Sequence, residues 1–202
     1  MSTNPYDYEN RQGIRPISWA EFHGLCKGVA QAVAAWKPGI ILAVGRGGYY
    51  PGTLIAHILR IEVYPVRLSR RVQDVVTHQQ PQWSIWPPED IKGKRVLVVD
   101  EISSTGVTLN MVKAETEKRG AGEVRLAALY AHTKGAQVPD YIGLVSDDLI
   151  LNPWDREVFI DGQFQMHPEY VGALQEQGVE PDKSLLIQAA LIQPTKKPSA
   201  CS

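Results

Sequence analysis

Three short runs of continuous apolar residues constrain the fold of this chain most strongly. They are residues 39 to 45 (GIILAVG), 94 to 100 (KRVLVVD) and 123 to 132 (EVRLAALYAH). A strand that is apolar on both sides is typical of a parallel sheet with helices on both faces. Residues 61 to 68 also suit a strand, and residues 141 to 146 form a weaker one.

Helical patterns alternate with these strands. Residues 17 to 36 carry apolar side chains at helical spacing, and Ser18 and Glu21 have the spacing of an N-terminal capping box. Residues 51 to 60 begin with a proline at the expected helix start, and residues 107 to 119 suit a further helix. The alternation predicts a three-layer α/β fold with a mostly parallel, twisted sheet of about five strands.

Size and composition are those of one globular domain, with 202 residues, 44% hydrophobic and 21% charged. The net charge of -1 argues against bulk nucleic-acid binding, which requires a basic face. Cys26 and Cys201 give neither a disulfide framework nor a zinc spacing, so we expect a reducing, cytoplasmic location. We expect no membrane span, because no apolar run approaches roughly 18 residues, and no signal peptide, because the N-terminus MSTNPYDYENRQG lacks a basic-then-apolar pattern.

The predicted domain has a core at residues 1 to 160, including the N-terminal helix. Residues 161 to 202 are expected to form a C-terminal appendage of the same domain, and its polar tail, PTKKPSACS, to fray. Residues 69 to 90 contain three prolines, and we expect this segment to be irregular and mobile.

Two acids end the second apolar run, in the stretch VLVVDEISSTGVTL at residues 96 to 109. In open α/β sheets, ligands bind beyond the carboxyl ends of the strands, where Asp100 and Glu101 are expected. Carboxylates accept hydrogen bonds from sugar hydroxyls or hold water around Mg²⁺. The hydroxyl-rich residues that follow lead into a helix N-terminus, which favours a phosphate. The stretch therefore fits a sugar phosphate. A purely structural strand–turn–helix is disfavoured, because two adjacent acids at a buried strand end are costly.

A glycine-rich turn follows the first apolar run. In AVGRGGYYPG, at residues 43 to 52, Arg46 lies among three glycines. Free backbone amides and a guanidinium group suit a diphosphate. Such a turn is weak evidence alone, but two phosphate-compatible loops at two parallel strand ends support each other.

The stretch 96 to 109 resembles the phosphoribosyl-pyrophosphate (PRPP) motif of type I phosphoribosyltransferases, with four apolar residues, two acids and a T-G-x-T ending. The resemblance implies that fold with a small hood, and it implies that Asp100 and Glu101 hold the ribose hydroxyls and Mg²⁺. The implied 5-phosphate ligands are Ser103, Ser104, Thr105, Gly106, Val107 and Thr108. The glycine-rich turn resembles the family's pyrophosphate loop, which often bears a cis or strained peptide; its implied ligands are Arg46, Gly47 and Gly48, joined by Arg70.

The stretch DDLILNPWDREVF, at residues 147 to 159, resembles the base-contacting segment of xanthine/guanine and hypoxanthine phosphoribosyltransferases. Leu149 takes the position of the aromatic residue that stacks on the purine, and Ile150 supplies the backbone contact. The lysine that reads the 6-oxo group corresponds to His132 by ungapped spacing, and Lys134 is the nearest lysine.

Two further positions complete the implied site. Asp155 takes the place of an acid that helps to hold a second Mg²⁺ near pyrophosphate. Ser104 replaces the acid that serves as candidate general base in the purine enzymes, and a neutral serine is a poor base near pH 7. The resemblance covers residues 39 to 160.

The implied activity is transfer of ribose 5-phosphate from PRPP to a nitrogen base, with release of pyrophosphate and a nucleoside monophosphate as product. A 6-oxopurine is the favoured base and salvage the implied role, in a homodimer or homotetramer. Ser104 and Leu149 keep open a PRPP-dependent transferase for a pyrimidine or a specialised base. A regulatory protein that binds PRPP or nucleotides without transferase activity is the alternative from another class.

Overall fold

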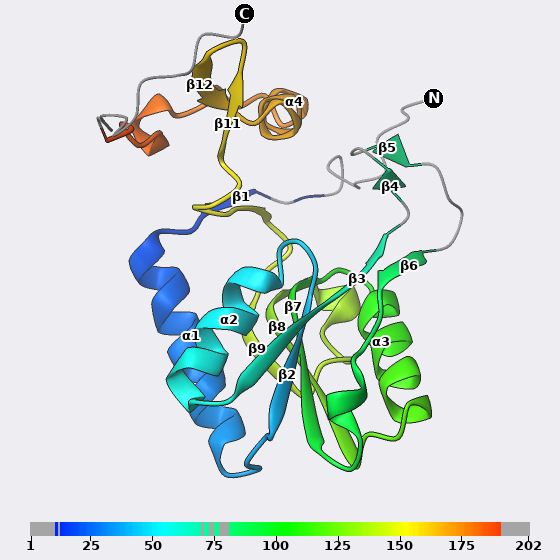
Figure 1. Cartoon of the computed structure of the whole chain (residues 1–202). Coiled ribbons are helices and arrows are strands. Elements are labelled where there is room, and N and C mark those ends of the chain that lie inside the picture. Colours follow the sequence, from blue (N-terminus) through cyan, green and yellow to red (C-terminus); the bar gives the residue numbers. More distant parts are fainter. Residues whose placement is uncertain (1–10, 12, 70, 73–74, 77–80, 191–202) are drawn as a thin grey trace, which may run out of the picture.

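A six-stranded sheet forms the centre of the computed structural model, which describes residues 11, 13–69, 71–72, 75–76 and 81–190 (Figure 1). The strand order within it is β6 (Gln82–Ile85), β3 (Glu62–Ser69), β2 (Ile40–Val44), β7 (Arg95–Ser103), β8 (Glu123–Ala131) and β9 (Tyr141–Val145). All neighbouring pairs are parallel except β3 and β6. The predicted α/β class and mostly parallel sheet are confirmed.

The sixth strand comes from the segment that we expected to be irregular. Within residues 69 to 90, β6 pairs antiparallel with β3, and β4 (Arg71–Val72) pairs with β5 (Val75–Val76). The irregular interpretation is therefore wrong in part. Leu68 and Trp83 are register partners, and Trp83 packs against the buried cluster under that edge of the sheet. This long-range contact is absent from any local pattern.

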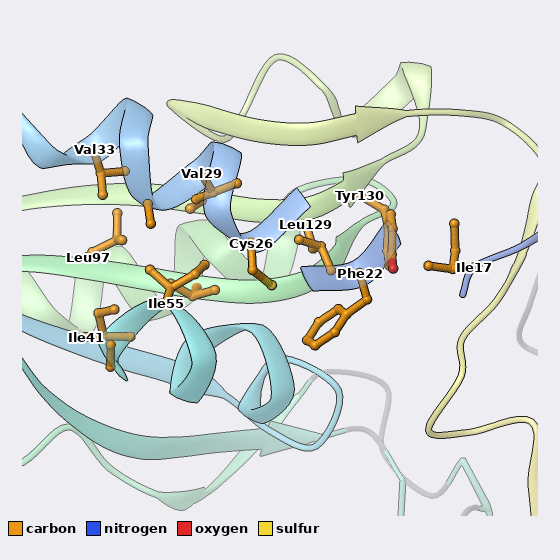
Figure 2. Close-up of a cluster of buried hydrophobic side chains, with 14 of the residues drawn as sticks. Ile17, Phe22, Cys26, Val29, Val33, Ile41, Ile55, Leu97, Leu129 and Tyr130 are labelled. Atoms are coloured by element: carbon orange, nitrogen blue, oxygen red, sulfur yellow. The ribbon is translucent and has the colours of Figure 1, made fainter. Parts of the chain in front are cut away.

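Helices cover both faces of the sheet, which confirms the three layers. The helices α1 (Trp19–Ala34) and α2 (Tyr49–Leu59) lie on one face, and α3 (Val107–Lys118) lies on the other (Figure 1). Neighbouring strand residues alternate between the two cores: Ile41 packs with α1 and α2, whereas Ile40 and Leu42 pack with α3. Figure 2 shows the first of these clusters, in which Leu97 and Leu129 of the sheet meet Cys26 and Val29 of α1.

The helix starts differ slightly from the predicted ones. Ser18 caps α1, and its hydroxyl oxygen accepts a hydrogen bond from the Glu21 amide at 3.1 Å, as the capping-box spacing indicated. The second helix begins at Tyr49, two residues before the expected start at Pro51. Proline is tolerated there because amides of the first helical turn have no partner within the helix.

A smaller layer, here called the hood, stands above the carboxyl ends of the strands (Figure 1). It consists of β1 (Ile14–Pro16), β10 (Leu149–Leu151), β11 (Glu157–Ile160), β12 (Gln163–Met166) and α4 (Pro168–Glu176). β1 pairs parallel with β10, and β11 forms an antiparallel hairpin with β12. Short 3₁₀ turns are η2 (Glu89–Ile91), η3 (Thr133–Gly135) and η4 (Lys183–Leu185).

The appendage that we predicted from residue 161 belongs to this hood. Position 160 is the last residue of β11, so the hairpin joins the two predicted parts. Met166 and Tyr170 are buried together with Leu149 and Leu151. The predicted tail PTKKPSACS lies outside the described residues. Within the described part of the chain, no helix is long and apolar enough to span a membrane.

Candidate active site

The sequence-predicted loops converge because their strands are neighbours. The glycine-rich turn follows β2, the acid pair lies on β7, and these two strands pair in parallel. Their carboxyl ends therefore meet at one edge of the sheet. Our expected end of the second strand at residue 100 is wrong, because β7 continues to Ser103. Asp100, Ile102 and Ser103 still pair with β8, so the two acids lie among the last four residues of the strand.

Asp100 and Glu101 are partly buried carboxyl groups at consecutive positions of β7. Burial raises the pKa of Asp100 to about 7, and one oxygen of this group accepts a hydrogen bond from the Glu101 amide at 2.7 Å. Burial also raises the pKa of Glu101 to about 8, and the negative charges of Asp100 and Asp155 add to that rise. A cation or a hydroxyl donor brought by a ligand would relieve this cost.

Glu101 lies between the hood and the glycine-rich turn. The Asn152 side-chain amide donates a hydrogen bond to Oε1 of Glu101. Oε2 lies so close to Gly47 that a β-carbon at position 47 would overlap the carboxylate. Glu101 thus joins the residues predicted for ribose, for pyrophosphate and for the base end.

The turn after β2 needs glycine for close approach. A β-carbon on Gly48 would lie 2.8 Å from the carbonyl oxygen of Val99 and 3.0 Å from the Cα atom of Asp100. The Gly45–Arg46 peptide bond is cis, as the resemblance implied for this loop. The side chain of Arg46 is exposed, whereas Arg70, the other cation predicted for pyrophosphate, lies outside the described residues.

The predicted phosphate loop leads into α3. Gly106 is its N-cap, in the left-handed region at φ +78°, and no side chain of the described residues caps this helix end. The first amides of α3 are therefore available to an anion. Ser104, Thr105 and Val107 are exposed and Thr108 is half-buried.

Ser103 differs from the other residues of this predicted loop. Its side chain is buried on β7, and its hydroxyl donates a hydrogen bond to the carbonyl oxygen of Gly135 at 3.0 Å. The structure therefore leaves Ser104, Thr105 and Val107 exposed and Thr108 half-buried, whereas Gly106 is buried and the Ser103 hydroxyl points into the fold.

The predicted base-contacting side chains have mixed surroundings. Leu149 is buried in the hood cluster, and Ile150 is buried in the cluster beneath α1. Neither side chain is open to a base, which leaves their backbone groups for that contact. Lys134 is exposed on η3.

His132 is buried at the end of β8. Its Nδ1 atom lies 2.7 Å from the carbonyl oxygen of Ser146. Burial lowers the pKa of His132, so the ring is neutral at pH 7. Because a carbonyl oxygen only accepts, Nδ1 carries the proton, and Nε2 remains as a hydrogen-bond acceptor. A family lysine at this position would offer a donor instead.

Several residues that sequence reasoning did not single out support the site. Asn152 reaches Glu101, and Trp154 stacks on Tyr50 of α2 with ring centroids 4.6 Å apart. Trp154 also contacts Phe22 of α1 edge to face. The Asn-Pro-Trp-Asp stretch at residues 152 to 155 stood out in the sequence. Only the fold shows that its asparagine contacts Glu101 of β7 and that its tryptophan contacts Tyr50 of α2.

The carboxylates fit a Mg²⁺ ion that is completed by water and substrate, rather than a metal held by protein ligands alone. Among the described residues, no three His, Cys, Asp or Glu side chains converge on one metal position. Mg²⁺ keeps several waters and commonly uses one or two carboxylates together with substrate phosphates. Asp100 and Glu101 supply two such groups, and Asp155 is exposed but close enough for its charge to act on Glu101.

Comparison with known proteins agrees with this geometry. A family model described as a phosphoribosyl transferase domain matches residues 16–160. Hypoxanthine-guanine phosphoribosyltransferase of Saccharomyces cerevisiae is 30% identical over 143 residues, covering 62% of this chain and 61% of that protein. The match thus spans less than two thirds of that relative. Xanthine-guanine phosphoribosyltransferase of Nitratidesulfovibrio vulgaris is 29% identical over 149 residues, covering 72% of this chain and 86% of that protein.

Two solved structures are similar as well. A purine phosphoribosyltransferase from Pyrococcus horikoshii has a TM-score of 0.65 and 29% identity, covering 74% of this chain and 99% of that one. A hypothetical protein from Neisseria gonorrhoeae with bound ppGpp has a TM-score of 0.60 and 26% identity, covering 81% of this chain and 97% of that one.

Proposed function

Because this chain belongs to the phosphoribosyl transferase domain family, we propose that it transfers ribose 5-phosphate from PRPP to a purine base and releases pyrophosphate. The observation that carries the proposal is the meeting of two anion-compatible loops and an acid pair at the carboxyl edge of β2 and β7. A 6-oxopurine is the favoured base, supported by the relatives named for hypoxanthine, xanthine and guanine. The role would be purine salvage in the cytoplasm, by a homodimer or homotetramer.

In this reaction the C1–O bond to pyrophosphate breaks and a C1–N bond to the base forms. Positive charge grows on the ribose ring, where the carboxylates of Asp100 and Glu101 hold the hydroxyls. Negative charge grows on pyrophosphate, where Arg46 and the amides of the glycine-rich turn stabilise it. The 5-phosphate binds the amides at the start of α3, with the hydroxyls of Thr105 and Thr108 beside them. Mg²⁺, held by Asp100 and Glu101 with Asp155 near pyrophosphate, would neutralise part of the leaving group's charge.

The residues at the base end of the site give a reason to keep a second class of base as substrate. Ser104 donates a hydrogen bond more readily than it accepts a proton, and the neutral His132 ring offers an acceptor in place of a lysine donor. Such a hydrogen-bond acceptor suits the N1–H group of a 6-oxopurine and also the N3–H group of a uracil-type pyrimidine. A pyrimidine or a specialised base is the alternative substrate.

A regulatory protein is the second candidate function, and one specific observation favours it. The Neisseria protein that resembles this chain holds ppGpp, a guanine nucleotide with two diphosphate groups. A protein with this site could bind such a nucleotide without transferring ribose. The two functions differ in pyrophosphate release, which only the transferase produces.

The test measures pyrophosphate release from PRPP and Mg²⁺ with guanine, hypoxanthine, xanthine, adenine, uracil and orotate in turn. We expect a clear signal with a 6-oxopurine. The double variant Asp100→Asn/Glu101→Gln should lose this signal and bind PRPP at least about 10-fold more weakly, because each carboxylate accepts a charge-assisted hydrogen bond.

The matched control is Asp161→Asn/Glu176→Gln, which removes two exposed carboxylates from the hood. It should behave as the unmodified protein does. Unchanged PRPP affinity in the acid-pair variant would overturn the site assignment. No release with any base, together with tight ppGpp binding, would favour the regulator.

A further inference from the structure

Asn152 is a buried polar residue at the junction of hood and sheet. It follows β10 directly, and its side chain is only 2% exposed. Its amide nitrogen donates to Oε1 of Glu101, which lies 51 positions earlier in the chain. Its carbonyl oxygen, Oδ1, is buried and has no hydrogen-bond partner among the described residues.

The backbone around Asn152 is held from several sides. The Leu151 carbonyl accepts hydrogen bonds from the Ile17 amide at 3.0 Å and from the Arg156 guanidinium at 3.3 Å. On the other side, Trp154 is stacked on Tyr50. Asn152 therefore lies between two anchored residues, Leu151 and Trp154, and its side chain contacts Glu101 before any ligand binds.

The orientation of the amide follows from the charge of its partner. When Glu101 is ionised, as it would be beside a bound cation, turning the group over would set Oδ1 against a carboxylate oxygen, and two acceptors would meet. The N–H group must therefore face Glu101, and Oδ1 faces away from that bond.

A ribose hydroxyl can donate a hydrogen bond to a carboxylate oxygen and can accept others. Such a hydroxyl also suits the Glu101 carboxylate, whose second oxygen lies over Gly47 of the glycine-rich turn. We propose that Asn152 positions the Glu101 carboxylate for the ribose of PRPP. This inference rests on the proposed function.

The first experiment is a double-mutant cycle on PRPP binding, measured by calorimetry with Mg²⁺ present. Asn152→Leu keeps the approximate volume of the side chain and removes both polar groups. We expect it to weaken PRPP binding about 10-fold or more, with a rise in KM for PRPP and little change in KM for the base. In a Glu101→Gln background the same substitution should have a much smaller effect, because Asn152 acts largely through Glu101.

The control and the rescue variant separate positioning from general stability. Asn110→Leu makes the same replacement at an exposed position of α3 and should leave PRPP affinity unchanged. Asn152→Asp keeps an acceptor but sets a second carboxylate against Glu101, so it should bind PRPP no better than Asn152→Leu. Asn152→Gln retains both groups and should recover part of the affinity.

The outcomes distinguish the two proposals. If the unmodified protein does not bind PRPP, the proposed function fails, and the ribose role of Asn152 fails with it. If the unmodified protein binds PRPP and Asn152→Leu binds it equally well, only this inference is overturned. Equal losses in both backgrounds would also overturn it, because they would show that Asn152 acts independently of Glu101.

Discussion

At the scale of single residues, Asp100 and Glu101 link the site to the stability of the protein. The pKa values of these two groups rise from 3.8 and 4.5 to about 7 and about 8 on folding, chiefly through burial. The folded chain therefore holds protons that the unfolded chain has released between about pH 4 and pH 8. We expect the acid pair to lower the free energy of unfolding as the pH rises through this window.

Urea denaturation at pH 5, 6, 7 and 8 tests this expectation in the ligand-free protein. The variant Asp100→Asn/Glu101→Gln should show a flatter pH profile and gain stability relative to the unmodified protein at pH 8. The exposed pair Asp161→Asn/Glu176→Gln should not change the profile. Parallel profiles for the acid-pair variant and the unmodified protein would mean that water or a nearby cation already compensates these carboxylates.

The residue types of the site were readable from sequence, but their contacts were not. Two acids follow one apolar run, and a glycine-rich turn follows another apolar run. These two patterns predicted that the acids and the turn meet at the carboxyl edge of the sheet. The partner of Ser103 is the Gly135 carbonyl, and the partner of Glu101 is Asn152, 51 positions away. Such pairs depend on how the strands and the hood pack, which no local pattern records.

At the scale of elements, apolar runs predicted the central strands well, because burial on both faces leaves a continuous pattern. β1 and β6 were missed because they are short and lie outside the buried middle of the sheet. β6 is an edge strand in which only Trp83 is half-buried and the other side chains are exposed, and prolines lie on both sides of it. Its pairing with β3 sets Trp83 opposite Leu68, and these two residues are not close in the sequence.

Arg156 connects three parts of the fold that are far apart in the sequence, which local sequence patterns do not predict. This buried guanidinium donates to the carbonyl oxygens of Ile17 at 2.9 Å, Leu185 at 3.0 Å and Leu151 at 3.3 Å. It thereby ties the start of α1, the end of β10 and η4 together. We expect Arg156→Ala to lower the free energy of unfolding by about 2 to 4 kcal/mol, because three carbonyl groups lose a charged donor.

Chemical denaturation measures this cost, with two variants for comparison. Arg156→Lys keeps the charge but cannot reach three carbonyl groups with one ammonium, so it should recover little. Arg15→Ala breaks a surface pair with Glu21 and should cost at most about 1 kcal/mol. If Arg156→Ala costs no more than Arg15→Ala, the guanidinium does not hold these elements together.

At the scale of the whole molecule, the hood and the sheet have separate buried cores. Leu149, Leu151 and Leu174 are buried in the hood cluster, whereas Leu97 belongs to the cluster between the sheet and α1 (Figure 2). The hood is joined to the sheet layers through the Asn152–Glu101 contact and the hydrogen bonds of Arg156. Ile150 and Trp154 add apolar contacts with the cluster beneath α1. Because the hood also has a buried cluster of its own, it can open locally.

Leu174→Ala tests the separation, because it opens a cavity in the hood core and should cost about 2 to 5 kcal/mol locally. Amide hydrogen exchange should accelerate in β10, β12 and α4 while β2, β7 and β8 keep their protection. Leu97→Ala is the matched change in the sheet core and should accelerate exchange in β7 and its neighbours. Because Leu151 precedes Asn152, loosening the hood should also free Asn152 from Glu101 and weaken PRPP binding. Uniform acceleration over the whole chain by Leu174→Ala would instead show that hood and sheet unfold as one cooperative unit.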